Sequence, residues 1–138
     1  MIYLDSAAAV KLIHTEAHSA ALRRYLDERP ELGWVSSALL EVETFRALAR
    51  ATPPAEMPTV MNDFHTLLDF VDRIEIDPGI RISAQAVNPP TVRSLDAIHL
   101  ATGLYLHKQG RITSFVTYDQ RLADAATAGG LAVEIPTD

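Results

Sequence analysis

The sequence predicts an α/β fold, with a mostly parallel five-stranded sheet that carries helices on both faces. Short apolar runs typical of strands alternate with longer stretches of helical periodicity. Parallel neighbouring strands require crossover connections, and helical crossovers cover the faces of the sheet. The length of 138 residues and the hydrophobic content of 48% suit a packed core. We therefore expect a single domain over residues 1–138.

Each expected element has a local reason. The strands are short apolar runs, and they are expected at 2–4, 34–35, 73–76, 114–117 and 131–135. The helices repeat apolar residues at helical spacing, and they are expected at 7–14, 17–29, 37–50, 55–70, 81–87, 94–110 and 120–128. Proline pairs at 53–54 and 89–90 predict loops. Ser94 is the expected N-cap of its helix, and Gly110 is the glycine that ends it.

Charge and composition exclude several classes of protein. The 12 Lys and Arg against 18 Asp and Glu give a net charge of −6, which argues against a protein that coats nucleic acid with a basic surface. No apolar run approaches the roughly 20 residues of a membrane-spanning helix, and the first residues lack a positively charged leader. We therefore expect an unprocessed cytoplasmic protein. Without cysteine, any metal must be held by oxygen or imidazole ligands.

Two aspartates follow predicted strands. Asp5 comes directly after residues 2–4, and Asp119 follows residues 114–117 with one residue between. Each stands where a helix begins, so each could be only a helix N-cap. Ligands of open parallel sheets, however, bind beyond the carboxyl ends of the strands. The pair therefore favours a functional site in one crevice.

Three further acidic residues lie on predicted helices. Asp96 is in the first turn of a helix that is apolar on almost every side, where the helix dipole favours it but little water solvates it unless that end opens into a cleft. Glu41 and Glu43 differ by roughly 200° around their helix, so only one of them can join Asp5. Helix geometry does not choose between them, and Glu43 could instead pair with Arg46.

Four segments, in their order along the chain, resemble PIN-domain ribonucleases of the VapC toxin type. They are Tyr3-Leu4-Asp5-Ser6, Glu43-Thr44-Phe45-Arg46-Ala47-Leu48, Ser94-Leu95-Asp96-Ala97-Ile98-His99-Leu100-Ala101-Thr102 and Val116-Thr117-Tyr118-Asp119-Gln120-Arg121-Leu122. The resemblance spans nearly the whole chain, and it is most specific around Asp96 and Asp119. It implies a three-layer α/β/α fold and a metal-dependent endoribonuclease that a cognate VapB-type antitoxin neutralises.

The resemblance also implies the site. It selects Glu43 over Glu41, because Glu43 precedes Arg46-Ala47 as the acidic residue of the family does. The four carboxylates are then those of Asp5, Glu43, Asp96 and Asp119. Where the family usually has a hydroxyl pair after its first aspartate, this chain has Ser6 followed by alanine, so the hydroxyls expected beside the metal are those of Ser6 and Thr117.

An all-oxygen site suits Mg²⁺ or Mn²⁺, because these hard cations prefer carboxylate ligands, and the histidines show no zinc-ligand spacing. We assign Asp5 and Asp96 to direct coordination, and Glu43 and Asp119 to metal-bound waters or a second ion. His99 is interpreted as a core histidine whose hydrogen bonds are satisfied.

Positive charges near the acidic residues have two interpretations. Each could hold an RNA phosphate or form a surface ion pair. These residues are Arg46, Arg50, Arg93 and Arg121. Lys11, by contrast, has the placement of an ordinary solvated helix charge. The expected partners are RNA, the antitoxin and a second copy of this chain in a homodimer.

Other families with this fold class fit less well. A response-regulator receiver needs an acidic pair at the first strand and a late lysine, whereas Asp5 stands alone and no lysine follows Lys108. A haloacid-dehalogenase phosphatase needs a second aspartate at the position of Ala7. Glycine-rich phosphate loops are absent, so nucleotide binding has no support. The remaining alternative is a catalytically silent PIN-like module that binds RNA or a partner.

Overall fold

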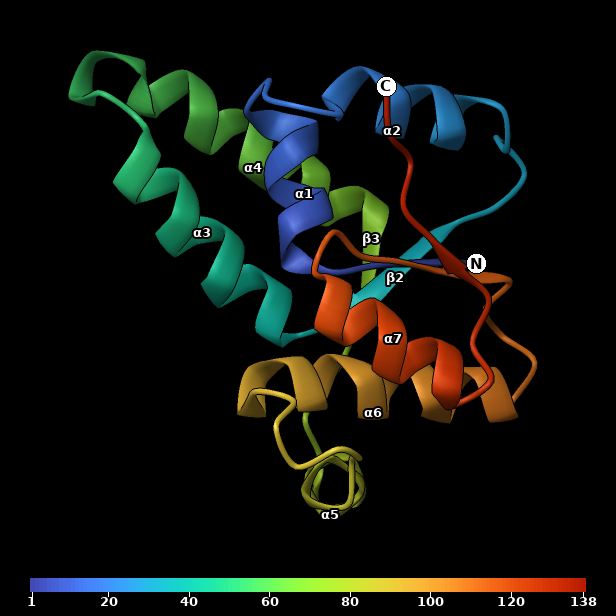
Figure 1. Cartoon of the computed structure of the whole chain (residues 1–138). Helices are drawn as coiled ribbons and strands as arrows, with labels where there is room; N and C mark the ends of the chain where they lie inside the picture. The colour runs from blue at the N-terminus through green and yellow to red at the C-terminus, as the bar shows by residue number, and fades with distance from the viewer.

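A computed structural model describes residues 1–138. Its five strands form one fully parallel sheet in the order β3-β2-β1-β4-β5. The strands are β1 (Ile2–Leu4), β2 (Trp34–Ser37), β3 (Val71–Ile74), β4 (Ser114–Val116) and β5 (Val133–Glu134). Helices lie on both faces (Figure 1). The predicted α/β class and its parallel five-stranded sheet are confirmed.

The helices connect these strands. They are α1 (Ser6–Ile13), α2 (Ser19–Asp27), α3 (Leu39–Ala51), α4 (Met57–Phe70), α5 (Pro78–Gln85), α6 (Ser94–Lys108) and α7 (Gln120–Ala128), with a 3-10 turn over Pro54–Glu56. No helix is both long enough and apolar enough to span a bilayer.

The two faces of the sheet bury different side chains of β1, because successive residues of a strand point to opposite faces. Ile2 and Leu4 pack in a cluster with residues of α1 and α2. Tyr3 faces the other way, into a cluster with residues of α6 and α7, among them Leu100 and Leu122. The three-layer arrangement therefore follows from the alternation within a single strand.

Two predicted boundaries near β3 and α5 are wrong. The strand expected at 73–76 begins at Val71, because Val71 pairs with Trp34 and α4 runs straight into it. The helix expected at 81–87 begins earlier, at Pro78. Its start is set by Asp77, whose Oδ1 accepts a hydrogen bond from Ile80 N–H at 2.8 Å.

The predicted N-cap of α6 is also wrong. Ser94 is the first helical residue, and Arg93 occupies the cap position without a side-chain cap bond. The first helical hydrogen bond runs from Ala97 N–H to the Arg93 carbonyl at 2.8 Å. At the other end the prediction is confirmed, since Gly110 has φ +68°, a left-handed conformation that suits glycine.

Gly103 of α6 allows close packing against the sheet. A Cβ at this position would lie 2.7 Å from Phe115 Cε2, and the Phe115 ring stacks on Tyr3 with centroids 4.6 Å apart. We expect Gly103→Ala to lower the free energy of unfolding by about 1–3 kcal/mol, because overpacking outweighs the gain in helix propensity. Urea unfolding measures the change. Gly110→Ala would serve as the matched comparison, where strain comes from φ and no side chain is crowded. An unchanged or higher stability of Gly103→Ala would contradict the packing.

Candidate active site

The parallel sheet places the starts of several helices at one edge. Because α1, α3 and α7 follow β1, β2 and β4, their first turns lie at the carboxyl ends of these strands. Figure 1 shows the first turn of α6 at the same end of the molecule. Helix N-termini carry partial positive charge and favour nearby carboxylates. The edge is therefore suited to hold several acidic side chains.

Asp5 lies at this edge with only 4% of its surface exposed. Its Oδ1 accepts a hydrogen bond from Ala8 N–H at 2.9 Å, so the cap interpretation of Asp5 is confirmed. Burial raises the pKa of Asp5, against hydrogen bonds from the Thr117 hydroxyl and Ala8 N–H and the influence of His99, all of which lower it. A cap alone needs no buried carboxylate beside other acidic groups. The placement is therefore compatible with both a cap and a ligand.

Asp96, in the first turn of α6, and Asp119, the N-cap of α7, line the same hollow. Burial raises the pKa of Asp96, and the negative charge of Asp119 raises it further, followed by smaller contributions from Glu43 and Asp5. Asp119 caps α7, with its Oδ1 accepting from Leu122 N–H at 2.9 Å. The charges of Asp119, Glu43 and Asp5 thus all act on Asp96.

Glu43 and Glu41 point to different surroundings, as their spacing requires. Glu43 Oε1 lies 2.6 Å from His99 Nε2, and no ion pair joins Glu43 to Arg46. Glu41 instead pairs with Arg73 at 3.1 Å. Of the two glutamates, it is Glu43 that acts on the charges of Asp5 and Asp96.

The donors of this site are carboxylate oxygens, which are the ligands that hard cations prefer. No three acidic or imidazole side chains are arranged to ligate one ion by themselves. Mg²⁺ usually keeps several waters and uses one or two carboxylates. Burial raises the pKa of Asp5 and of Asp96. These carboxylates thus offer oxygen donors whose charged forms a nearby cation would stabilise.

The predicted supporting hydroxyls have different surroundings. Thr117 is fully buried near the two aspartates that follow the strands. Its Oγ1 accepts from Asp119 N–H at 3.1 Å, and its side chain lowers the pKa of Asp5. Ser6 is half-buried and lines a groove that also contains Glu43. Thr117 therefore acts on both aspartates, while Ser6 faces open space.

The four predicted arginines divide between two hollows beside the carboxylates. Arg46 and Arg50 line a groove of about 580 Å³ together with Ser6 and Glu43. The second hollow, of about 140 Å³, is lined by the other two arginines and by two of the carboxylates, namely Arg93, Arg121, Asp96 and Asp119. All four arginines are exposed, and none has an acidic partner within 4.0 Å. The surface ion-pair interpretation is therefore wrong in this structure.

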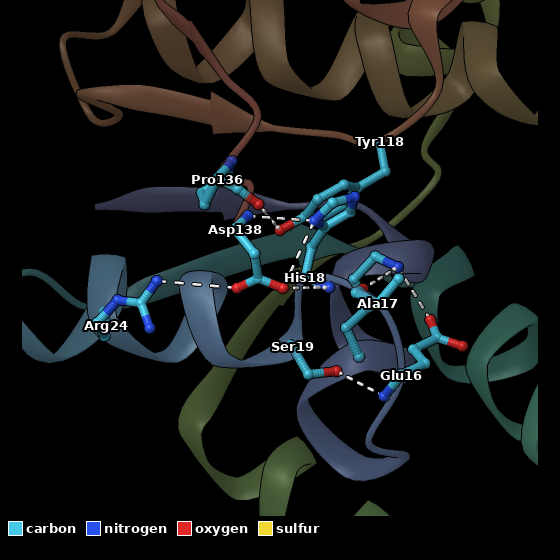
Figure 2. A network of polar contacts seen from close by, with 9 residues as sticks. Glu16, Ala17, His18, Ser19, Arg24, Tyr118, Pro136 and Asp138 are labelled. Carbon is cyan, nitrogen blue, oxygen red and sulfur yellow. Dashed lines mark hydrogen bonds and ion pairs between the residues drawn. The ribbon is translucent and has the colours of Figure 1, made fainter.

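The last residues of the chain fold back toward α1 and α2 (Figure 2). The Asp138 carboxylate accepts a hydrogen bond from His18 N–H at 3.2 Å and lies 3.8 Å from Arg24 Nη2. The Tyr118 hydroxyl donates to the Pro136 carbonyl at 2.9 Å, and the Tyr118 ring stacks on that of His18. These contacts fasten Tyr118, the residue that directly precedes the cap of α7.

Lys11 is part of the same network, so its description as an ordinary solvated charge is wrong. Its side chain is only 12% exposed, and its ammonium lies 4.7 Å from the centroid of the Tyr118 ring. It also donates to Glu16 Oε1 at 3.1 Å and to the Ala17 carbonyl at 3.0 Å. Burial raises the pKa of Tyr118 to about 12, and the charge of Asp5 adds to this rise. Tyr118 therefore stays a neutral hydroxyl near the carboxylates.

His99 is a core histidine with both ring nitrogens paired, as predicted, but sequence reasoning missed its partner in the site. It is 1% exposed, and it contacts the Tyr3 hydroxyl as well as Glu43. The only local signal was its position three residues after Asp96, one turn along the same helix.

Comparison with known proteins places these features in a family. A model of the PIN domain matches residues 2–128. Ribonuclease VapC35 of Mycobacterium tuberculosis is 49% identical over 136 residues, which cover 99% of this chain and 97% of that protein. Ribonuclease VapC46 of the same species is 41% identical over 137 residues, covering 99% and 98%. Ribonuclease VapC47 is 33% identical over 138 residues, covering 99% and 97%. The chain thus belongs to the PIN-domain family and, within it, to the VapC-type ribonucleases.

Proposed function

We propose that this protein is an endoribonuclease that acts as the toxin of a toxin-antitoxin pair in the cytoplasm. The observation that carries the proposal is the gathering of four carboxylates at the carboxyl edge of the sheet, in a chain of the VapC type. The catalytic residues are Asp5, Glu43, Asp96 and Asp119. The substrate is RNA, and the cofactor is Mg²⁺ or Mn²⁺.

The carboxylates divide into two kinds in this proposal. Asp5 and Asp96 would coordinate the cation directly, because burial raises the pKa of each and a cation would favour the charged carboxylate. Glu43 and Asp119 would hold metal-bound waters or a second ion. A bound divalent cation would lower the pKa of a coordinated water and offset the charge that builds on the phosphate.

The remaining steps belong to side chains of this chain. Thr117 positions Asp119 by accepting a hydrogen bond from its N–H, and its side chain favours the charged form of Asp5. Arg46 and Arg50 bind RNA phosphates on the Glu43 side, where their guanidinium groups are free of acidic partners. Arg93 and Arg121 do so beside Asp96 and Asp119. The RNA backbone would thus cross the carboxylates between two positive flanks.

A cleavage assay separates this proposal from a silent binding module. Purified protein is incubated with end-labelled RNA in Mg²⁺, in Mn²⁺ and in EDTA. We expect internal cuts with either metal and none in EDTA, because the carboxylates repel the phosphate without a cation. RNA binding without cleavage under all three conditions would instead support the silent module. Sequencing the 5′ ends of cleaved RNA then identifies the substrate.

The second expectation concerns partners. Expressed from its native locus, the tagged chain should co-purify with a small VapB-type antitoxin and should form a homodimer within the complex. The antitoxin would offer a basic side chain to the carboxylates, since arginine binds carboxylates in a bidentate manner. Copurification followed by mass spectrometry and light scattering measures both. A lone monomer that does not slow growth would count against the toxin assignment.

A further inference from the structure

A hydrogen-bonded chain of three side chains runs from the buried Tyr3 and His99 to Glu43 in the candidate site. The Tyr3 hydroxyl lies 2.7 Å from His99 Nδ1, and His99 Nε2 lies 2.6 Å from Glu43 Oε1. Tyr3 is fully buried and His99 is 1% exposed, whereas the Glu43 side chain keeps 20% of its surface. The chain therefore connects a site carboxylate to the interior of the protein.

The direction of each hydrogen bond follows from the partners. An ionised carboxylate only accepts, so His99 Nε2 carries the proton toward Glu43. In a neutral ring Nδ1 is then the acceptor, and the Tyr3 hydroxyl donates to it. The Tyr3 oxygen in turn accepts from Ser37 N–H at 3.2 Å. In this arrangement both ring nitrogens of His99 and the Tyr3 hydroxyl are hydrogen-bonded.

We propose that His99 is a positioning residue for Glu43, and that Tyr3 orients it. His99 binds Glu43 Oε1 and so gives the carboxylate a single orientation relative to Asp5 and Asp96. The proposal deepens the ribonuclease proposal above and rests on it for the effect on cleavage. It makes Glu43, on the solvent-facing helix α3, part of a rigid site.

The placement of the three residues in the fold supports this proposal. Tyr3 lies on β1, two residues before Asp5, and His99 lies on α6, three residues after Asp96. The hydrogen-bonded chain therefore ties together α3 and α6, which carry Glu43 and Asp96, and β1, which Asp5 directly follows. Outer partners of this kind orient ligands and tune metal affinity.

Aromatic packing holds the Tyr3 ring in place. Its ring stacks on Phe115 at an interplanar angle of 10°, and it meets the His99 ring edge-on, with centroids 5.9 Å apart and an angle of 87°. Both geometries are favourable for aromatic pairs. The hydroxyl of Tyr3 thus has little freedom to leave His99.

A purely structural role would require only that the buried polar groups be satisfied. His99→Gln and His99→Asn separate that role from positioning, because the two amide side chains differ in length. The amide nitrogen of glutamine in His99→Gln can occupy the place of Nε2 and donate to Glu43. The shorter amide in His99→Asn reaches the place of Nδ1 and contacts only Tyr3.

The first readout is Mn²⁺ affinity, measured by electron paramagnetic resonance on the metal-titrated protein. We expect His99→Asn to weaken Mn²⁺ binding on the order of tenfold and His99→Gln to stay within about threefold of wild type. In the cleavage assay, kcat should fall in the same order while KM for RNA stays unchanged, because Glu43 does not hold the RNA. Equal Mn²⁺ affinities in the two variants would overturn the positioning role.

Tyr3→Phe tests the orienting step with the loss of one oxygen atom, and it decides the matter if the His99 variants fail to fold. Its matched control is Tyr25→Phe on α2, away from the carboxylates. This substitution also removes one hydroxyl, which is half-buried and hydrogen-bonded to Ser114 Oγ at 2.8 Å. We expect Tyr3→Phe to weaken Mn²⁺ binding by about threefold or more and Tyr25→Phe to leave it unchanged. Equal Mn²⁺ affinities of Tyr3→Phe and Tyr25→Phe would contradict the role of Tyr3.

A measurement on the metal-free protein tests the positioning of Glu43 separately from the ribonuclease proposal. Nitrogen NMR of the His99 ring should show a protonated Nε2 and a bare Nδ1, and the Nδ1 resonance should shift in Tyr3→Phe. A proton on Nδ1 in the wild-type protein would overturn the hydrogen-bond directions. Absence of RNA cleavage by the wild type, with these signatures intact, would reject the ribonuclease proposal and retain the positioning of Glu43.

Discussion

RNA cleavage by the Asp96→Asn variant should fall by more than about a hundredfold. This loss is larger than that expected when a residue that only orients a metal ligand is changed. The same loss is expected for Asp5→Asn. Each substitution removes a charge from the site and keeps the size of the side chain, and asparagine can still accept the cap bond that Asp5 receives from Ala8 N–H. Single-turnover cleavage rates measure the effect, and circular dichroism checks that the fold persists.

The sharpest control for this prediction lies on one helix. Glu43→Gln should lower cleavage strongly, whereas Glu41→Gln, two residues away, should be nearly silent because Glu41 pairs with Arg73 outside the site. Both variants lose the same charge from α3, so a general electrostatic effect would change them equally. Wild-type rates in folded Asp5→Asn or Asp96→Asn would remove these residues from the site.

The second large effect is expected in thermal melting. Mg²⁺ or Mn²⁺ that binds only the folded protein should stabilise it by about 2.7 kcal/mol at roughly a hundredfold excess over Kd. For a domain of this size, that raises Tm by several degrees. Asp96→Asn should lose most of this response. Melting curves in EDTA, in Mg²⁺ and in Mn²⁺, recorded for both proteins, test the prediction.

The same variants should differ in how stability depends on pH. Burial and neighbouring carboxylates raise the pKa of Asp96 in the folded state. The folded protein then binds more protons than the unfolded chain, so stability falls as pH rises from the unfolded pKa of about 3.9 through the raised folded value. Asp96→Asn removes this loss. In EDTA it should therefore be more stable than wild type at neutral pH, and the difference should vanish toward pH 3.

The prediction is contradicted if metal does not change the Tm of the wild type and Asp96→Asn is less stable than wild type in EDTA. The acidic residues would then serve as helix caps and ion-pair partners. Because Asp5 and Asp119 do accept cap bonds, this outcome is a real alternative that the melting experiment can distinguish.

Much of the sheet could be predicted from local sequence, because strand and helix periods repeat over a few residues. Boundaries were less predictable where two elements meet without a loop. The start of β3 at Val71 depends on pairing with Trp34, which lies far away in the chain. The start of α5 depended on an Asp-Pro signal just upstream, which was present in the sequence and outweighed the apolar pattern.

By itself, the sequence determined the α/β class and the two aspartates at strand ends, since both follow from short-range patterns and parallel connectivity. It left the two glutamates of α3 open, because helix geometry only separates their directions, and resemblance alone favoured Glu43. Tertiary structure decided the surroundings of each: Glu43 meets His99 from 56 residues further along the chain, and Glu41 meets Arg73. Such partners depend on how α3, α6 and β3 pack around the sheet, and no local period encodes that packing.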